Sequence, residues 1–147
     1  MRAVVTRVKE ASVEIEGKVN GAIGKGYLIL LGISPSDTER EAEWLADRIV
    51  GCRVFEDETG KMNLSLAQVG GALLVVSQFT LYADLKSRRP GFTGAAKPDI
   101  AKPLYEKFMD ILQSKGFTVA HGEFGADMQV YSVNDGPVTL VWDSERK

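Results

Sequence analysis

Apolar and polar positions along the 147 residues predict many short strands and two helices. Alternation with a period of two is typical of a half-buried strand, whereas apolar residues three and four positions apart indicate a helix. Short apolar segments bounded by glycine or polar turns predict strands over residues 2–8, 11–15, 19–23, 27–33, 52–55, 72–78, 118–121, 128–133 and 138–142. A hairpin turn is expected at Glu16-Gly17-Lys18.

Two segments have helical spacing instead. Ser36 lies three residues before Glu39 in a pattern that resembles a capping box, which predicts a helix to about Val50 that ends at Gly51. Its buried face would carry Ala42, Leu45, Ala46 and Ile49.

An irregular loop over residues 83–98 precedes a second predicted helix over about 98–115. Its apolar stripe would carry Ile100, Leu104, Phe108 and Ile111. Helices that do not alternate regularly with strands indicate an α+β fold, and no linker or repeat divides the single domain expected over residues 1–147.

Composition narrows the classes of chemistry. The chain is 44% hydrophobic and 26% charged, as in ordinary globular domains. A single cysteine, Cys52, excludes an intrachain disulfide and is expected to be a small buried side chain. A single histidine, His121, excludes a multi-histidine metal site within one chain and is expected to be a structural or surface residue. We expect no metal and no cofactor. The absence of a signal peptide and of a long apolar segment, together with a free cysteine, favours the cytoplasm and no membrane.

Charge is unevenly distributed. The net charge of −2 argues against a protein that binds nucleic acid over a broad basic face. Residues 61–98, however, carry five basic and one acidic side chain. Within them, Lys86, Arg88 and Arg89 form either a solvated loop or a contact surface for phosphates.

Two polar segments could carry chemistry. Ser77-Gln78-Phe79-Thr80-Leu81 follows a very apolar strand, and strand ends place hydroxyl, amide and free N–H groups at a rim that a ligand can reach. The simpler interpretation is a strand end leading into a turn. Asn134-Asp135-Gly136-Pro137-Val138-Thr139 has the composition of a tight hairpin, and its proline raises the chance of a cis peptide bond.

These two segments carry a resemblance that extends over nearly the whole chain. Together with the N-terminal MRAVVTRV, SRRPGF (residues 87–92) and FGADM (residues 124–128), SQFTL and NDGPVT resemble the D-aminoacyl-tRNA deacylases. The resemblance implies a largely antiparallel or mixed, curled, barrel-like sheet with two main helices. It also implies a homodimer that hydrolyses the ester of D-aminoacyl-tRNA at the acceptor end, and of glycine mischarged on tRNA for alanine.

The resemblance assigns roles to individual residues. It implies catalysis by Ser77, Gln78, Phe79 and Thr80, with backbone N–H groups polarising the ester carbonyl. Rejection of L-amino acids would come from a cis Gly136-Pro137 bond inserted from the partner subunit, supported by Arg7, Asn134 and Thr139. Phe79 and Met128 would form the adenosine pocket, and Lys86, Arg88 and Arg89 would contact tRNA. Thr80 as a covalent nucleophile, a generic serine or threonine esterase, and a non-catalytic nucleic-acid-binding module on the same fold remain alternatives.

Overall fold

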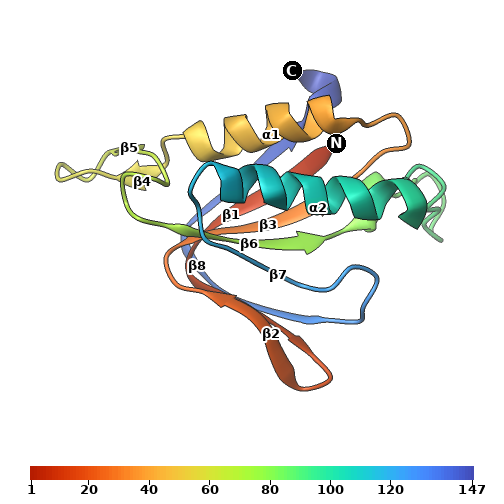
Figure 1. Cartoon of the computed structure of the whole chain (residues 1–147), viewed down its shortest axis with the longest axis horizontal. Helices are drawn as coiled ribbons and strands as arrows, with labels where there is room; N and C mark the ends of the chain where they lie inside the picture. Colours follow the sequence, from red (N-terminus) through yellow and green to blue (C-terminus); the bar gives the residue numbers. More distant parts are fainter.

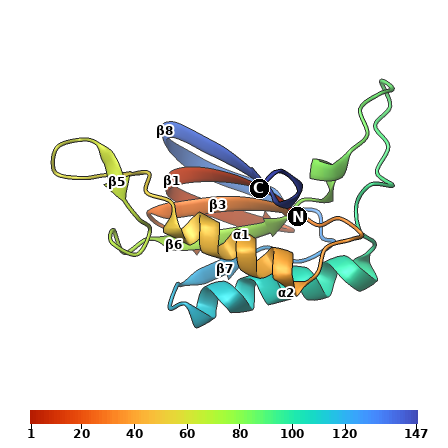
Figure 2. The same cartoon turned by 90° about the horizontal axis from the view of Figure 1, so that it is seen from above.

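A curled mixed sheet and two α-helices make up most of the computed structural model, which describes all 147 residues (Figure 1). In chain order the elements are β1 (Arg2–Ile15), β2 (Lys18–Ile23), β3 (Gly26–Gly32), α1 (Glu39–Gly51), β4 (Phe55–Glu56), β5 (Met62–Leu64), β6 (Ala72–Ser77), the 3₁₀ helix η1 (Phe79–Tyr82), α2 (Pro98–Ser114), β7 (Val119–His121), β8 (Gln129–Asp143) and the 3₁₀ helix η2 (Ser144–Arg146). Figure 2 shows both α-helices on the same side of the sheet. The predicted α+β class is confirmed.

Strand β1 connects three other strands. Its first half pairs with β3 and its second half with β2, while β8 pairs with it along nearly its whole length, all antiparallel. β3 pairs parallel with β6, and β6 pairs parallel with β7, which gives the order β2-β1-β3-β6-β7. The side-chain amide of Asn20 in β2 donates to the His121 carbonyl in β7 at 2.8 Å. This contact joins the two ends of the strand order, so the sheet is a nearly closed barrel.

Buried side chains form two layers on opposite faces of β3 and β6, because successive residues of a strand point to opposite sides. Tyr27 and Leu31 face the helices within a cluster of 23 buried residues. Leu28, Leu74 and Val76 face the other way, within a cluster of seven inside the curled sheet. Burial on both faces explains why these two strands are continuous apolar segments in the sequence.

The first helix has the predicted buried face but a different cap. Its buried residues are Ala42, Leu45, Ala46 and Ile49, as predicted. The N-cap is Thr38, which forms a capping box with Glu41, so the predicted cap at Ser36 is wrong. The reason is a turn that precedes the helix, in which the Asp37 N–H donates to the Ser34 carbonyl at 3.1 Å. There the Ser36 hydroxyl pairs with the Ser34 hydroxyl at 3.2 Å.

The second helix has the predicted bounds to within one residue, but its stripe is rotated. Leu104 and Phe108 are buried as predicted, whereas Ile100 is 39% exposed and Ile111 is partly buried. The buried side chains are Ala101, Leu104, Tyr105, Phe108, Met109 and Leu112. At the two ends of the helix the buried residue is therefore the one that follows the predicted residue: Ala101 instead of Ile100, and Leu112 instead of Ile111. None of the helices has the length and apolar character needed to cross a lipid bilayer.

Three strand predictions need correction. Residues 2–15 form one strand, and residues 129–143 form another, where the sequence predicts two strands each. The segment Asn134–Thr139 makes no tight hairpin, because both of its flanks pair with the same strand, β1. The predicted strand over residues 52–55 is reduced to the two-residue β4, which pairs with the unpredicted β5.

Candidate active site

A cavity of about 550 Å³ lies where β3 and β6 end and α2 begins. Its walls also include the loop before α2 and the segment before β8. Hydrophobic side chains form most of the lining, and Lys97 is the only ionisable side chain among the lining residues. No histidine and no carboxylate lines the cavity, which leaves no ordinary general base within it.

Most of the catalytic block predicted from the sequence lies in one wall of the cavity. Ser77 ends β6, and the Gln78 N–H donates to the Leu31 carbonyl at 2.8 Å, which fixes the block against β3. Phe79 then begins η1, and the first N–H groups of a helix have no partner within it. The amide of Phe79, which lines the cavity, and the amide of Thr80, the next residue, therefore open η1 without a partner inside the helix. Ser77, Gln78 and Phe79 line the cavity, whereas the Thr80 side chain does not.

Thr80 is held by its neighbour rather than by a base. The Gln78 side-chain Nε2 donates to the Thr80 Oγ1. An amide nitrogen that donates a hydrogen bond cannot accept the proton of a hydroxyl. The structure thus gives Thr80 a fixed orientation but no group that would activate it.

Aromatic side chains stand at the exposed part of the same cavity. The rings of Phe79 and Phe92 meet edge to face with centroids 5.2 Å apart. Both are partly solvent-exposed, at 54% and 42%, and both line the cavity together with Met128 and Phe124. Exposed aromatic faces beside a cavity are the ordinary binding surface for a nucleobase.

The Gly136-Pro137 segment lies elsewhere in the chain's own fold. Between the pairs Val8–Asn134 and Thr6–Thr139, one residue of β1, Arg7, faces four residues of β8. This bulge bends β8 near its middle, on the side of the molecule where β4 lies (Figure 1). The Gly136-Pro137 peptide bond is cis, and Gly136 has a φ of +128°. Neither residue lines the cavity of its own chain.

The buried side chain of Arg7 holds this bulge in place. Its side chain is 5% exposed, and its Nε donates to the Asp135 carbonyl at 3.1 Å. Its Nη1 donates to the Val54 carbonyl, and its Nε lies 3.5 Å from the Asp135 carboxylate. Arg7 therefore connects three segments that are distant in sequence. It contacts Asp135 rather than the carbonyl oxygens of Gly136 or Pro137.

The other two residues predicted to support this segment also lie in β8. The Thr139 hydroxyl pairs with the Thr6 hydroxyl across the strands at 3.3 Å. Asn134 accepts a hydrogen bond from the Ser132 hydroxyl at 2.7 Å on the exposed strand. Only the Thr139 contact joins two strands, whereas the Asn134 contact lies within β8.

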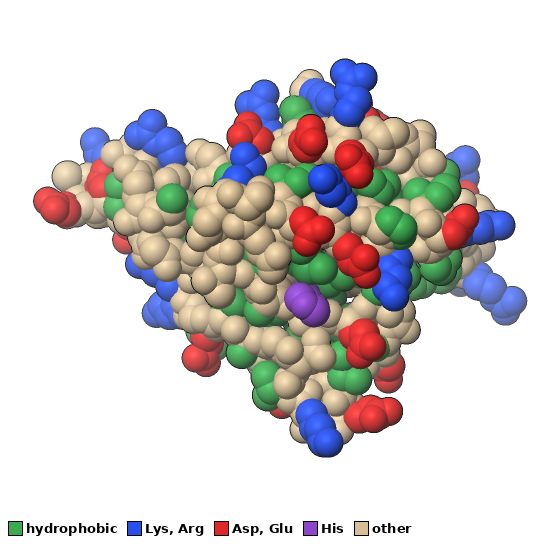
Figure 3. Space-filling view, viewed as in Figure 1, with side chains coloured by type: hydrophobic (Ala, Val, Ile, Leu, Met, Phe, Trp, Pro, Cys, Tyr) green, Lys and Arg blue, Asp and Glu red, His purple; other side chains and the backbone are tan.

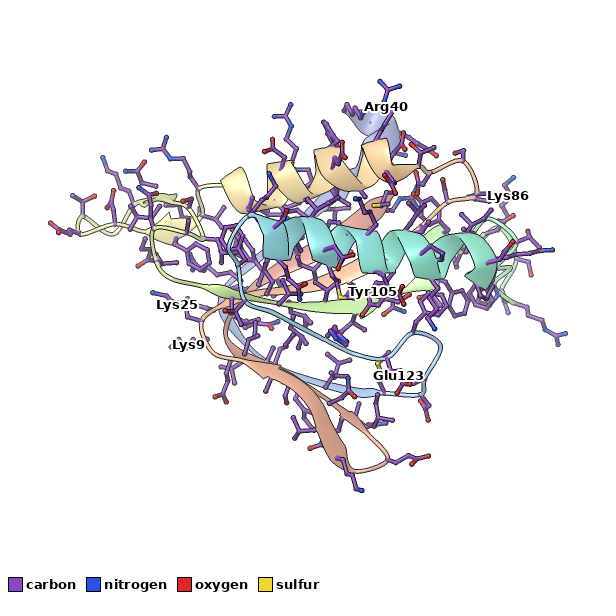
Figure 4. The ribbon with its side chains drawn as sticks, viewed as in Figure 1. Lys9, Lys25, Arg40, Lys86, Tyr105 and Glu123 are labelled. Atoms are coloured by element: carbon purple, nitrogen blue, oxygen red, sulfur yellow. The ribbon has the colours of Figure 1, made fainter.

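The predicted tRNA contacts form a separate projection. Lys86, Arg88 and Arg89 are exposed in a loop that extends away from the sheet (Figure 2). Two backbone hydrogen bonds between Asp84 and Gly91, of 2.7 and 2.9 Å, close the base of this loop. Lys86 lies beyond the start of α2 (Figure 4). None of the three cations lines the cavity.

Sequence and structure comparisons place the chain among known proteins. A family model described as D-Tyr-tRNA(Tyr) deacylase matches residues 4–143. The chain belongs to the D-Tyr-tRNA(Tyr) deacylase family. Curated relatives named D-aminoacyl-tRNA deacylase include one from Desulfatibacillum aliphaticivorans, 58% identical over 99% of this chain and 100% of the relative. Another from Thermus aquaticus is 58% identical over 100% of this chain and 97% of the relative.

Solved structures agree in fold. A structure titled "c-Myc DNA Unwinding Element Binding Protein" is 43% identical and superimposes with a TM-score of 0.92, over 98% of this chain and 99% of that one. A second, titled as a probable eukaryotic D-amino acid tRNA deacylase, is 15% identical with a TM-score of 0.83, over 96% and 97%. At that identity the second likeness concerns the fold alone.

In this deacylase-family chain, the lone histidine and cysteine lie away from the cavity. His121 is exposed on the face that carries the helices (Figure 3), with its Nδ1 2.6 Å from the Gly122 carbonyl. Cys52 is partly rather than fully buried, and burial raises the pKa of its thiol above the ordinary value. A thiol with a raised pKa is a poor nucleophile at neutral pH. The structure contains no group of three or more histidine, cysteine or acidic side chains that could hold a metal.

Among the cavity residues that sequence reasoning missed, three carry aromatic or charged side chains. Phe92, Phe124 and Lys97 line the cavity, but none was predicted as a site residue. Phe92 and Phe124 lie inside the SRRPGF and FGADM blocks, so a local signal was present for both. Lys97 belongs to the basic stretch 61–98 and lies directly before the proline that begins α2. Only the fold shows that it reaches the cavity.

Proposed function

We propose that this member of the D-Tyr-tRNA(Tyr) deacylase family hydrolyses the ester joining a D-amino acid to the terminal adenosine of tRNA, releasing both. Full-length relatives between 52% and 59% identical carry the name D-aminoacyl-tRNA deacylase. One observation carries the proposal: a single cavity combines the opening amides of η1 with an exposed aromatic pair. The first suits a developing oxyanion, and the second suits an adenine ring.

The chemistry follows from the groups at the cavity wall. Water adds to the ester carbonyl carbon, and the amides of Phe79 and Thr80 donate to the oxygen that becomes negative. The bond to the ribose oxygen then breaks, and that oxygen leaves with a proton. Because no histidine or carboxylate lines the cavity, the neighbouring ribose hydroxyl of tRNA assists the proton transfer. An aminoacyl ester is already reactive, so positioning supplies much of the required acceleration.

Selection of the D-enantiomer needs a rigid wall, which the Gly136-Pro137 segment supplies to a second copy of the chain. Arg7 holds the bulge through Asp135, and the backbone carbonyls of Gly136 and Pro137 on that bulge would bind the substrate α-ammonium and clash with the side chain of an L-residue. Glycine has no side chain and would pass, so glycine on tRNA for alanine is a second substrate. A homodimer is supported by β8, an edge strand with exposed Tyr131, Val133 and Val141.

The remaining contacts suit a brief encounter with tRNA. The projecting loop presents Lys86, Arg88 and Arg89 to the phosphates near the acceptor end. The rest of the chain is acidic, so affinity beyond the acceptor end would be low and tRNA would be released quickly. We place this activity in the cytoplasm, where aminoacyl-tRNA is made and used.

The competing function is nucleic-acid binding without catalysis, which the name of the 43%-identical structure suggests. A deacylation assay separates the two. Purified protein is mixed with D-Tyr-tRNA or L-Tyr-tRNA, and released tyrosine is measured. We expect rapid release from D-Tyr-tRNA and almost none from L-Tyr-tRNA. Equal rates on both enantiomers would refute chiral selection, and binding of tRNA without any release would favour the competing function.

A further inference from the structure

Lys97 is a cation without a partner at the wall of an otherwise uncharged cavity. It is exposed, and it forms no ion pair and no side-chain hydrogen bond. Asp99, in the first turn of the same helix, makes no ion pair with it either. A cation at a cavity wall with no internal partner is free to bind an anion carried by the ligand.

The backbone around Lys97 is fixed from both sides. The N–H of the preceding residue, Ala96, donates to the Ile33 carbonyl at 2.8 Å, which ties the segment to the end of β3. The Lys97 carbonyl accepts hydrogen bonds from Ile100 and Ala101 as the N-cap of α2. The 17-residue helix also directs the positive end of its dipole toward this point. The lysine is therefore mounted on a rigid part of the cavity and not on the projecting loop.

We infer that Lys97 binds the phosphate on the 5′ side of the terminal adenosine and so positions the ester in the cavity. This inference rests on the proposed function. In an aminoacyl-tRNA the amino acid carboxyl is esterified and neutral, and its amino group is positive. The anion closest to the ester is then the phosphate that links the last two nucleotides. An adenine beside Phe79 and Phe92 leaves the ribose, and with it this phosphate, near the loop that carries Lys97.

This contact differs in kind from those of the projecting loop. Lys86, Arg88 and Arg89 lie outside the cavity and would meet phosphates further along the strand. Lys97 shares a cavity with the amides of η1, so a phosphate bound to it would fix the distance to the reacting carbon. Losing the contact should thus weaken binding of even the smallest ligand that retains one phosphate.

Binding of two stable analogues tests the inference. Both carry D-tyrosine in amide linkage to the 3′ position of adenosine, and one also has a 5′-methylphosphate with the single charge of a phosphodiester. Affinities are measured by calorimetry for the wild-type protein, Lys97→Gln, Lys97→Arg and the control Lys102→Gln, which removes an exposed lysine of α2 outside this cavity. We expect the wild-type protein and the control to bind the phosphorylated analogue about tenfold more tightly than the other.

The variants then decide the outcome. Lys97→Gln should lower that ratio to about one without changing the affinity for the unphosphorylated analogue, and Lys97→Arg should retain most of it. A ratio unchanged in Lys97→Gln, or equal weakening of both analogues, would overturn the inference. A wild-type protein that binds both analogues equally would refute the phosphate contact alone. One that binds neither would remove the proposed function as well.

Discussion

The cavity and the Gly136-Pro137 bulge lie at two ends of the molecule and are held in place by different kinds of groups. At one end, the contiguous residues Ser77, Gln78 and Phe79 line the cavity, and the proposed oxyanion donors are the backbone amides that open η1. At the other end, the Gly136-Pro137 bulge is held by one buried side chain, Arg7, which connects β1 to β8 and to the segment before β4. Figure 2 shows the β4–β5 projection and the basic loop extending from opposite sides of the sheet.

This difference shows two ways in which the protein fixes the position of backbone groups: through the fold itself, or through a side chain from another segment. Amides that open a helix are oriented by the fold itself, so side-chain changes nearby alter them little. A bulge that departs from strand pairing lacks ladder hydrogen bonds and needs an outside brace. We therefore expect the position of the bulge to depend strongly on one side chain, and the position of the proposed oxyanion donors to depend little on the side chains of their own residues.

The largest expected effect is at the bulge. Arg7→Met keeps an unbranched chain of similar stem but removes the donors to the buried Val54 carbonyl and to the Asp135 carbonyl. Because buried acceptors without a partner are costly, the free energy of unfolding should fall by about 3 kcal/mol. Urea denaturation measures this loss. The ratio of D- to L-Tyr-tRNA deacylation should fall as well, since the bulge that carries the Gly136-Pro137 carbonyls would lose its contact through Asp135.

A matched substitution isolates the effect of burial. Arg53 also donates to a backbone carbonyl and to an amide oxygen, both of Asn63, but it is exposed. Arg53→Met should lower the free energy of unfolding by less than about 1 kcal/mol and leave selectivity unchanged. Similar losses for the two variants would show that the bulge does not depend on a buried brace.

The two ends also differ in how far the sequence predicts them. SQFTL is contiguous and follows an apolar strand, so its place at a strand end was predictable from local pattern alone. The course of β8 was not, because turn-forming residues such as Asn134 and Asp135 normally end a strand. Pairing of both flanks with β1 overrides that local preference. Likewise, no local pattern relates Lys97 to Ser77, since their proximity arises from the parallel pairing of β3 with β6 and the return of the chain through residues 83–97.

A smaller effect is expected in α1, which packs against both the sheet and α2 and contributes to neither end directly. Thr38→Ala removes the capping box with Glu41, and the free energy of unfolding at pH 7 should fall by about 1 kcal/mol. Deacylation of D-Tyr-tRNA and its enantiomer ratio should stay the same. Thr118→Ala, an exposed threonine with no side-chain hydrogen bond, serves as the control. Loss of selectivity in Thr38→Ala would mean that a lower stability of the whole fold is enough to reduce the enantiomer ratio, without any change at the bulge.

The same variant has a defined pH dependence. Hydrogen bonds from the Thr38 hydroxyl and N–H lower the pKa of the Glu41 carboxyl in the folded protein. The ionised cap thus stabilises the folded state above the unfolded pKa, and this part is lost as the pH falls through the lowered folded pKa. The stability difference between wild-type protein and Thr38→Ala should therefore shrink below about pH 4. A difference that grows on acidification would contradict this sign.

The smallest expected effect is next to the cavity wall, where one side chain of the predicted catalytic block is removed. Thr80→Ala leaves the backbone amide in place and deletes only a hydroxyl that accepts from Gln78. If amides and the tRNA hydroxyl carry the reaction, single-turnover rates on D-Tyr-tRNA should remain within about threefold of wild type. If Thr80 is a covalent nucleophile, the rate should fall by more than about a thousandfold, while Thr80→Ser stays active. A small loss here beside a large loss in Arg7→Met would show that the reaction depends on backbone at one end and on a braced side chain at the other.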